Sequence, residues 1–214
     1  DDYIENAGGT LNANTTTDRT FYYEILPSNY LELGLWIESE RLLHANVENV
    51  GIETQRKVVK EERRMRYDNR PYGTWMEEIM KRAYTVHPYR WTPIGSMEHL
   101  DAATLEEFNA YFDKYYGPNN AVLIVAGDID LDKTKKLVTD YFSEVKRGPE
   151  VDRDFPKEQP ITETIKTKAY DKNIQAPAII AAYKSMLVSV RLKITESVQK
   201  FTTARYALNG TISK

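Results

Sequence analysis

The stretch from Ile52 to Arg66 is highly charged, contains neither glycine nor proline, and is rich in strong helix formers. It therefore predicts a long helix. At about 100° per residue, Val58, Val59 and Met65 fall on one side of that helix together with Ile52. The first constraint on the fold is thus an amphipathic helix with one apolar stripe.

Two polar residues interrupt the stripe. Glu62 lies near its centre, about 40° from Val58, and Gln55 lies at about 60°. A carboxylate buried there costs several kcal/mol unless a cation compensates it. Two partners remain open, a metal ion and one of the neighbouring arginines, and the helix pattern alone favours the arginine.

Composition excludes several classes of function. Hydrophobic residues make up 41% of the chain, charged residues 29%, and the net charge is −3. This balance gives no reason to expect nucleic acid or an anionic membrane as partner. No apolar run approaches the roughly 18 residues of a membrane span. Without cysteine there is no disulfide, thiolate metal site or cysteine nucleophile, and the compartment stays open. No phosphate-binding glycine loop and no G-x-S-x-G nucleophile turn is present.

Helix and strand patterns do not alternate regularly. This arrangement predicts an α+β fold with a mainly antiparallel sheet flanked by helices. A glycine turn at Gly8 and Gly9 ends an initial helix. Thr104 and Glu107 have the spacing of a capping box. The strand predictions are a hairpin over Thr10–Leu26, a buried strand over Ala121–Ala126, and two further strands over Ile165–Tyr170 and Ala178–Tyr183.

The charged, proline-containing segment after residue 145 suggests a division of the chain. We expect a first domain over residues 1–145, a linker over 146–164, and the beginning of a second α+β domain over 165–214. The tail from about residue 185 is atypical, and a helix over Arg191–Ala207 is one interpretation of it.

Four motifs, weak one by one but specific in their order, carry a family resemblance. They are G-G-T-L-N-A-N-T at 8–15, Q-R-K-V-V-K-E-E at 55–62, H-P-Y at 87–89 with P-I-G at 93–95, and Y-Y-G-P-N-N-A to V-A-G-D-I-D over 115–130. Together they resemble the pitrilysin, insulinase and mitochondrial-processing-peptidase family of zinc metallopeptidases. The resemblance covers about residues 1–183. It implies a metallopeptidase domain of that type, followed by the start of a similar second domain.

The resemblance also implies a zinc site. Such enzymes carry an inverted H-x-x-E-H motif, whose histidines bind zinc and whose glutamate is the general base, and a downstream glutamate is the third ligand. Glu62 matches that ligand, with Glu61 as the alternative register. Where the family often has a second glutamate, seven residues earlier, this chain has Gln55 in a supporting position. None of the 214 residues is assigned a catalytic role, because the H-x-x-E-H element is expected before Asp1.

The family adds peptide substrate as a strand to a sheet edge, and Leu11, Asn12 and Ala13 match that edge. Asn12 is equally interpreted as making a structural hydrogen bond. The leading hypothesis is a zinc-dependent endopeptidase acting on peptides or unfolded protein segments, here a truncated chain inactive alone. A second homologous half or subunit is expected as partner. The alternative is a non-catalytic partner or core subunit of the same family.

Overall fold

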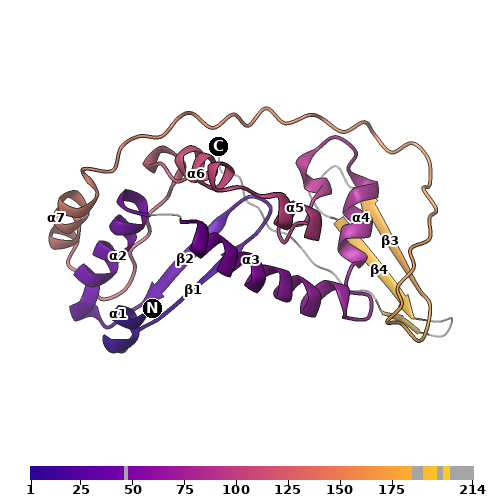
Figure 1. Cartoon of the computed structure of the whole chain (residues 1–214), viewed down its shortest axis with the longest axis horizontal. Coiled ribbons are helices and arrows are strands. Elements are labelled where there is room, and N and C mark those ends of the chain that lie inside the picture. The colour runs from indigo at the N-terminus through magenta and orange to yellow at the C-terminus, as the bar shows by residue number, and fades with distance from the viewer. Residues whose placement is uncertain (46–47, 185–189, 197–199, 203–214) are drawn as a thin grey trace. The chain divides into compact units, whose positions relative to one another are not determined.

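The computed structural model describes residues 1–45, 48–184, 190–196 and 200–202 (Figure 1). Contacts group the chain into two compact units. The first contains Asp1–Arg56 and Met97–Arg153, and the second contains Lys57–Ser96 and Asp154–Lys214. The boundary between the units falls within helix α3, which spans Asn49–Arg63. The predicted division at 146–164 remains a prediction.

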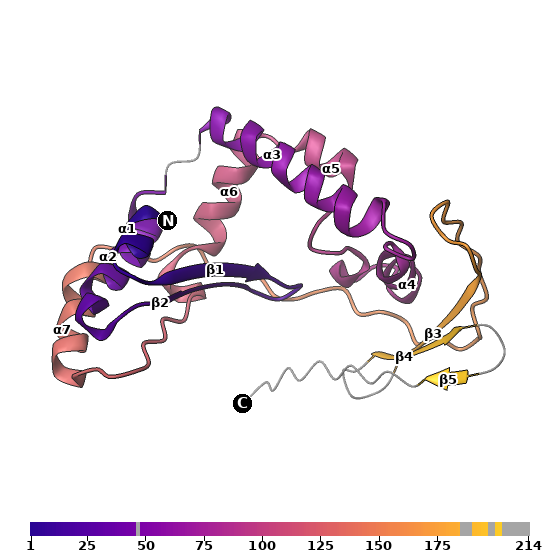
Figure 2. The same cartoon turned by 90° about the horizontal axis from the view of Figure 1, so that it is seen from below.

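The first unit combines a hairpin with helices. Its remaining elements are α1 (Asp2–Asn6), β1 (Thr10–Thr15), β2 (Thr20–Ile25), the 3-10 turn η1 (Ser28–Tyr30), α2 (Leu31–Leu43), α5 (Met97–Ala102), α6 (Leu105–Tyr115), the 3-10 turn η4 (Pro118–Asn120) and α7 (Leu131–Phe142). Helices α2 and α7 pack against each other, as both views show (Figures 1 and 2). Its buried apolar residues, among those described, are Ile4, Leu35 and Ile52.

The predicted hairpin is confirmed. Strands β1 and β2 are antiparallel, with Thr10 opposite Ile25 and Thr15 opposite Thr20. The turn before β1 requires glycine: a Cβ at Gly9 would lie 2.6 Å from a methyl carbon of Leu26. The close approach of Leu26 therefore leaves no room for a side chain at position 9.

The second unit contains the end of α3 and a separate small sheet. Its other elements are the π-helical turn η2 (Arg64–Asp68), α4 (Trp75–Ala83), the 3-10 turn η3 (Pro88–Arg90), β3 (Ala178–Lys184), β4 (Val190–Glu196) and β5 (Lys200–Thr202). The strands form an antiparallel sheet in the order β3-β4-β5 (Figure 2). The α+β class with antiparallel pairing is thus present, in two small sheets.

Three predicted elements are wrong. Ala121–Ala126 and Ile165–Tyr170 have no regular structure, and their apolar side chains are exposed, Val122 by 86% and Ile165 by 60%. A strand exists only through hydrogen bonds to a neighbour, and none of the described strands pairs with either segment. The helix suggested for Arg191–Ala207 is replaced by β4 and β5, while residues 197–199 and 203–207 lie outside the described part of the chain.

The segment between α7 and β3 has no helix or strand, and its part from Asp154 onward belongs to the second unit. The carboxylate of Glu158 accepts hydrogen bonds from the backbone N–H groups of Thr85, Val86 and His87 at 2.6–2.7 Å. These bonds, with His87 first among them, hold the pKa of Glu158 down to about 2. Further along, the Tyr72 hydroxyl donates to the carbonyl of Ala176.

Candidate functional site

Helix α3 confirms the predicted helix and shifts its bounds: it begins at Asn49 and ends at Arg63. The last predicted turn is the π-helical η2, closed by the N–H of Asn69 donating to the carbonyl of Arg64 at 2.9 Å. A π-turn inside or at the end of a helix is rare and is frequent at functional sites.

The face of α3 that is buried differs from the predicted one. Ile52 is 5% exposed and Arg63 8%, whereas Val58 and Met65 are 55% and 64% exposed. The predicted stripe is therefore rotated by about 90° from the buried face, at about 100° per residue. The physical reason is that arginine can bury its aliphatic stem while its guanidinium group forms hydrogen bonds. A prediction that places only apolar residues on the buried face does not include such an arginine.

Glu62 lies on the open side of α3, so its predicted burial in an apolar face is wrong. The Glu62 side chain is 37% exposed, and its Oε1 lies 2.8 Å from Nη1 of Arg66 one turn later. The Arg66 side chain is itself 70% exposed. An arginine partner, the alternative from the sequence, is thus present, as a surface pair of about 0–1 kcal/mol.

The described residues hold no group of three or more His, Cys, Asp or Glu side chains that could bind a metal ion. Zinc takes carboxylate oxygen readily, so Glu62 fits as a single ligand of a larger set. Gln55 lies two turns earlier on α3 with an exposed side chain. No described helix is long and apolar enough to cross a membrane.

The predicted substrate edge is β1, where Leu11 is half-buried and both Asn12 and Ala13 are exposed. Oδ1 of Asn12 accepts a hydrogen bond from the N–H of Ala13 at 2.7 Å. The structural hydrogen bond considered for Asn12 is therefore present, within the strand itself. This bond occupies one backbone donor of the edge.

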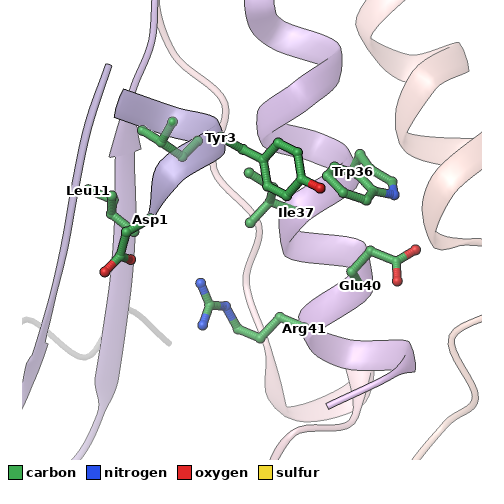
Figure 3. A pocket seen from close by; sticks show the side chains of 8 residues that line it. Asp1, Tyr3, Leu11, Trp36, Ile37, Glu40 and Arg41 are labelled. Carbon is green, nitrogen blue, oxygen red and sulfur yellow. The ribbon is translucent and has the colours of Figure 1, made fainter. Parts of the chain in front are cut away.

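Two hollows flank β1 in the first unit. One has a volume of about 380 Å³ and is lined by α1, α2 and Leu11. In Figure 3, Tyr3 and Trp36 adjoin on one side, with ring centroids 5.5 Å apart, and Arg41 extends from α2 toward Asp1. The other hollow, of about 440 Å³, is lined by Leu11, Asn12, Ala13 and acidic side chains that include Glu24 and Glu38.

The carboxylates of Glu24 and Glu38 both line this second hollow, and the sequence patterns did not identify them as a pair. Arg41 donates from Nε and Nη2 to the two oxygens of Glu38, both at 3.0 Å, and its guanidinium stacks over the Tyr22 ring at 4.2 Å. Burial, and then the hydrogen bond and charge of Glu38, raise the pKa of Glu24 to about 7. Only the i, i+3 spacing of Glu38 and Arg41 on α2 was visible in the sequence.

Comparison with known proteins agrees with these motifs. Residues 1–93 match the sequence model of the insulinase family (peptidase family M16), and residues 102–188 match the peptidase M16 inactive domain. The chain belongs to the insulinase family. The Helicobacter pylori zinc protease PqqE is 34% identical over 146 residues, 68% of this chain and 33% of that protein. The mitochondrial-processing peptidase subunit beta of Caenorhabditis elegans is 26% identical over 148 residues, 68% of this chain and 31% of that protein.

Solved structures of two bacterial proteases are similar to this chain in fold. A protease from Helicobacter pylori matches with a TM-score of 0.67 and 33% identity over 73% of this chain and 37% of that one. The first half of the Escherichia coli periplasmic protease PqqL matches with a TM-score of 0.59 and 25% identity over 69% of this chain and 32% of that one. The chain spans about a third of the length of the curated relatives it matches.

Proposed function

We propose that this insulinase-family chain contributes to a zinc-dependent endopeptidase that hydrolyses peptides or unfolded protein segments, with Glu62 as a zinc ligand. The observation that supports this most is the state of the Glu62 carboxylate. It has the motif position of the family's downstream ligand, it is accessible, and its ion pair with Arg66 is a surface pair. An incoming cation displaces such a pair at a cost of about 0–1 kcal/mol.

The remaining ligands and the general base belong, in this proposal, to an H-x-x-E-H element outside these 214 residues. Zinc held there would supply the activation of a water molecule and the polarisation of the peptide carbonyl. Within the chain, Glu62 holds the metal, and the amide of Gln55 orients a ligating group by hydrogen bonding. A second homologous half completes the enclosure of substrate.

Substrate binding is assigned to Leu11, Asn12 and Ala13 on β1. Backbone pairing along such an edge binds extended peptides with little dependence on side chains. The hollow of about 440 Å³ beside these residues leaves room for a substrate side chain. Pairing at Ala13 requires the Asn12 side chain to turn away from the Ala13 N–H, since it now accepts that hydrogen bond.

The test uses the complete natural protein and two neighbouring carboxylates on α3. Glu62→Gln is expected to lower zinc affinity by at least 100-fold and to abolish peptide hydrolysis. Glu61→Gln tests the alternative register. Glu61 is 58% exposed and pairs with Arg64 on the surface, and with Glu62 as the ligand this variant is expected to keep both properties. Zinc content and cleavage of an unfolded protein are measured in parallel.

Retention of zinc and activity in Glu62→Gln would refute the assignment. If the unsubstituted complete protein neither binds zinc nor cleaves peptides, the non-catalytic alternative replaces this proposal. The 214-residue chain alone is expected to show neither stoichiometric zinc nor activity.

A further inference from the structure

The residue after Glu62 is the centre of a buried polar network in the second unit. Arg63 donates from Nη1 and Nη2 to the two carboxylate oxygens of Glu77 on α4, at 2.7 and 3.0 Å. Both residues are almost fully buried, Arg63 at 8% and Glu77 at 7% exposure. Parallel two-bond pairing of this kind fixes direction as well as distance.

Other elements of the second unit close the network. Thr92 donates its hydroxyl to Oε1 of Glu77 at 3.1 Å, and Nη1 of Arg63 also donates to the carbonyl of Gly95. Asp68, at the end of the π-helical turn η2, lies 3.4 Å from Nη2 of Arg63. Burial opposes ionisation of Glu77, but the hydrogen bonds and charge of Arg63 outweigh it and hold the pKa of Glu77 below its usual range. The pair is therefore charged and satisfied at neutral pH.

We propose that the Arg63–Glu77 pair positions the Glu62 carboxylate by fixing the rotation of α3 about its own axis. This inference rests on the proposed zinc role of Glu62. Val58 and Met65, which lie on one side of Glu62 on the helix surface, are exposed, so apolar packing does not hold that side of α3. Arg66, which pairs with Glu62, is itself 70% exposed, so this ion pair lies at the surface.

The position of the Glu62 carboxylate is sensitive to rotation of α3 because the side chain lies far from the helix axis. A side-chain oxygen about 6 Å from a helix axis moves about 2 Å when the helix rotates by about 20°. A zinc–oxygen bond is itself only about 2.0–2.2 Å long. A small loss of rotational restraint at residue 63 therefore displaces a ligand at residue 62 by a whole bond length. The Arg63 side chain lies directly before the π-helical turn that begins at Arg64, so its paired contacts act at this end of α3.

The experiment measures zinc affinity in the complete natural protein by competition with a chelator. Arg63→Lys keeps the charge and loses the two-bond fork, and Glu77→Gln keeps the shape and loses the charge. Each is expected to weaken zinc binding 10- to 100-fold, the range typical of groups that orient metal ligands. Arg64→Lys is the matched control, since Arg64 is 47% exposed and pairs on the surface with Glu61; its zinc affinity is expected to stay unchanged.

A merely structural role gives a different pattern. It would lower the thermal midpoints of the zinc-free and zinc-loaded proteins equally and leave zinc affinity unchanged, which would overturn the proposal. If Arg63→Lys or Glu77→Gln does not fold, Thr92→Val, which removes one peripheral hydrogen bond, provides the same measurement with a smaller expected loss of about 3-fold or more; unchanged affinity there would also overturn it.

Glu62→Gln separates the two hypotheses. If Glu62→Gln loses zinc while the zinc affinity of Arg63→Lys is unchanged, only the positioning role of Arg63 is refuted, and the zinc role of Glu62 stands. Full zinc retention in Glu62→Gln refutes the proposed function itself.

Discussion

At the scale of single residues, the environment of a carboxylate decides its chemistry. Glu24 and Glu38 adjoin in the first unit, and Arg41 pairs with Glu38 and leaves Glu24 partly buried. Oε1 of Glu24 is buried without a hydrogen-bond partner among the described residues. Glu158 is the opposite case, because backbone N–H groups stabilise its charged form. The two carboxylates therefore respond to pH in opposite directions.

Glu24 makes the first unit less stable as pH rises. Its pKa is about 7 in the folded protein, against the ordinary glutamate value of 4.5 that applies to the unfolded chain. Folding therefore favours the protonated form. The stabilisation is fully present below about pH 4.5 and is lost as pH rises to about 7. Glu24→Gln is expected to remove this loss, so denaturant unfolding of the two proteins should diverge between pH 5 and 7.5. Parallel pH profiles of the free energy of unfolding would contradict the prediction.

At the scale of elements, the starts of α6 and α7 follow local sequence rules. Thr104 and Glu107 form the predicted capping box of α6: the Glu107 N–H donates to Oγ1 of Thr104 at 3.3 Å, and the Thr104 N–H donates to Oε2 of Glu107 at 2.9 Å. Asp130 caps α7 by accepting from the N–H of Lys133 at 2.8 Å. In both caps the interacting groups are three residues apart in the chain, so the local sequence is enough to predict them.

The cap on α6 has a measurable energy. Thr104→Ala leaves an N-terminal N–H group of the helix without its side-chain acceptor, and it is expected to cost about 1 kcal/mol of unfolding free energy. Thr139→Ala on α7 is the control. The Thr139 hydroxyl only donates to a carbonyl of its own helix at 3.0 Å, so little change is expected. If denaturant unfolding gives the same loss of unfolding free energy for both variants, the capping box is not the source of that loss.

Helix α3 shows where element-level reasoning stops. Its helical state was predictable, because helix propensity and the absence of glycine and proline are local. Its buried face was not, because Arg63 is buried through partners on α4 and in the 92–95 loop. The alternation of Val190, Leu192 and Ile194 with polar residues did indicate strand, and the helical interpretation overlooked it.

At the scale of the molecule, the exposed apolar segment Ala121–Ala126 stands out. Val122, Leu123 and Ile124 are 86%, 44% and 74% exposed, and the segment pairs with none of the described strands. A short apolar, charge-free stretch with unpaired backbone favours association between chains. The isolated chain is therefore expected to self-associate through it.

Ile124→Lys tests that expectation. The added charge should reduce light scattering by the isolated chain at high concentration, while its free energy of unfolding changes by about 0.5 kcal/mol or less, as for other surface substitutions. Thr139→Lys adds the same charge on the exposed face of α7 and should leave scattering as it is. A large loss of stability in Ile124→Lys would instead mean that the segment packs inside the protein.

The sequence by itself determined local features of this insulinase-family chain: the glycine turn, the β1–β2 hairpin, the helical state of α3, the capping box of α6, and the motif that marks Glu62. Each depends on residues close together in the chain. Only the tertiary structure decided which face of α3 is buried, that Glu62 is accessible, and that Arg63 is held by Glu77. Burial, strand pairing and ion pairs between elements depend on partners distant in sequence, whose positions no local pattern contains.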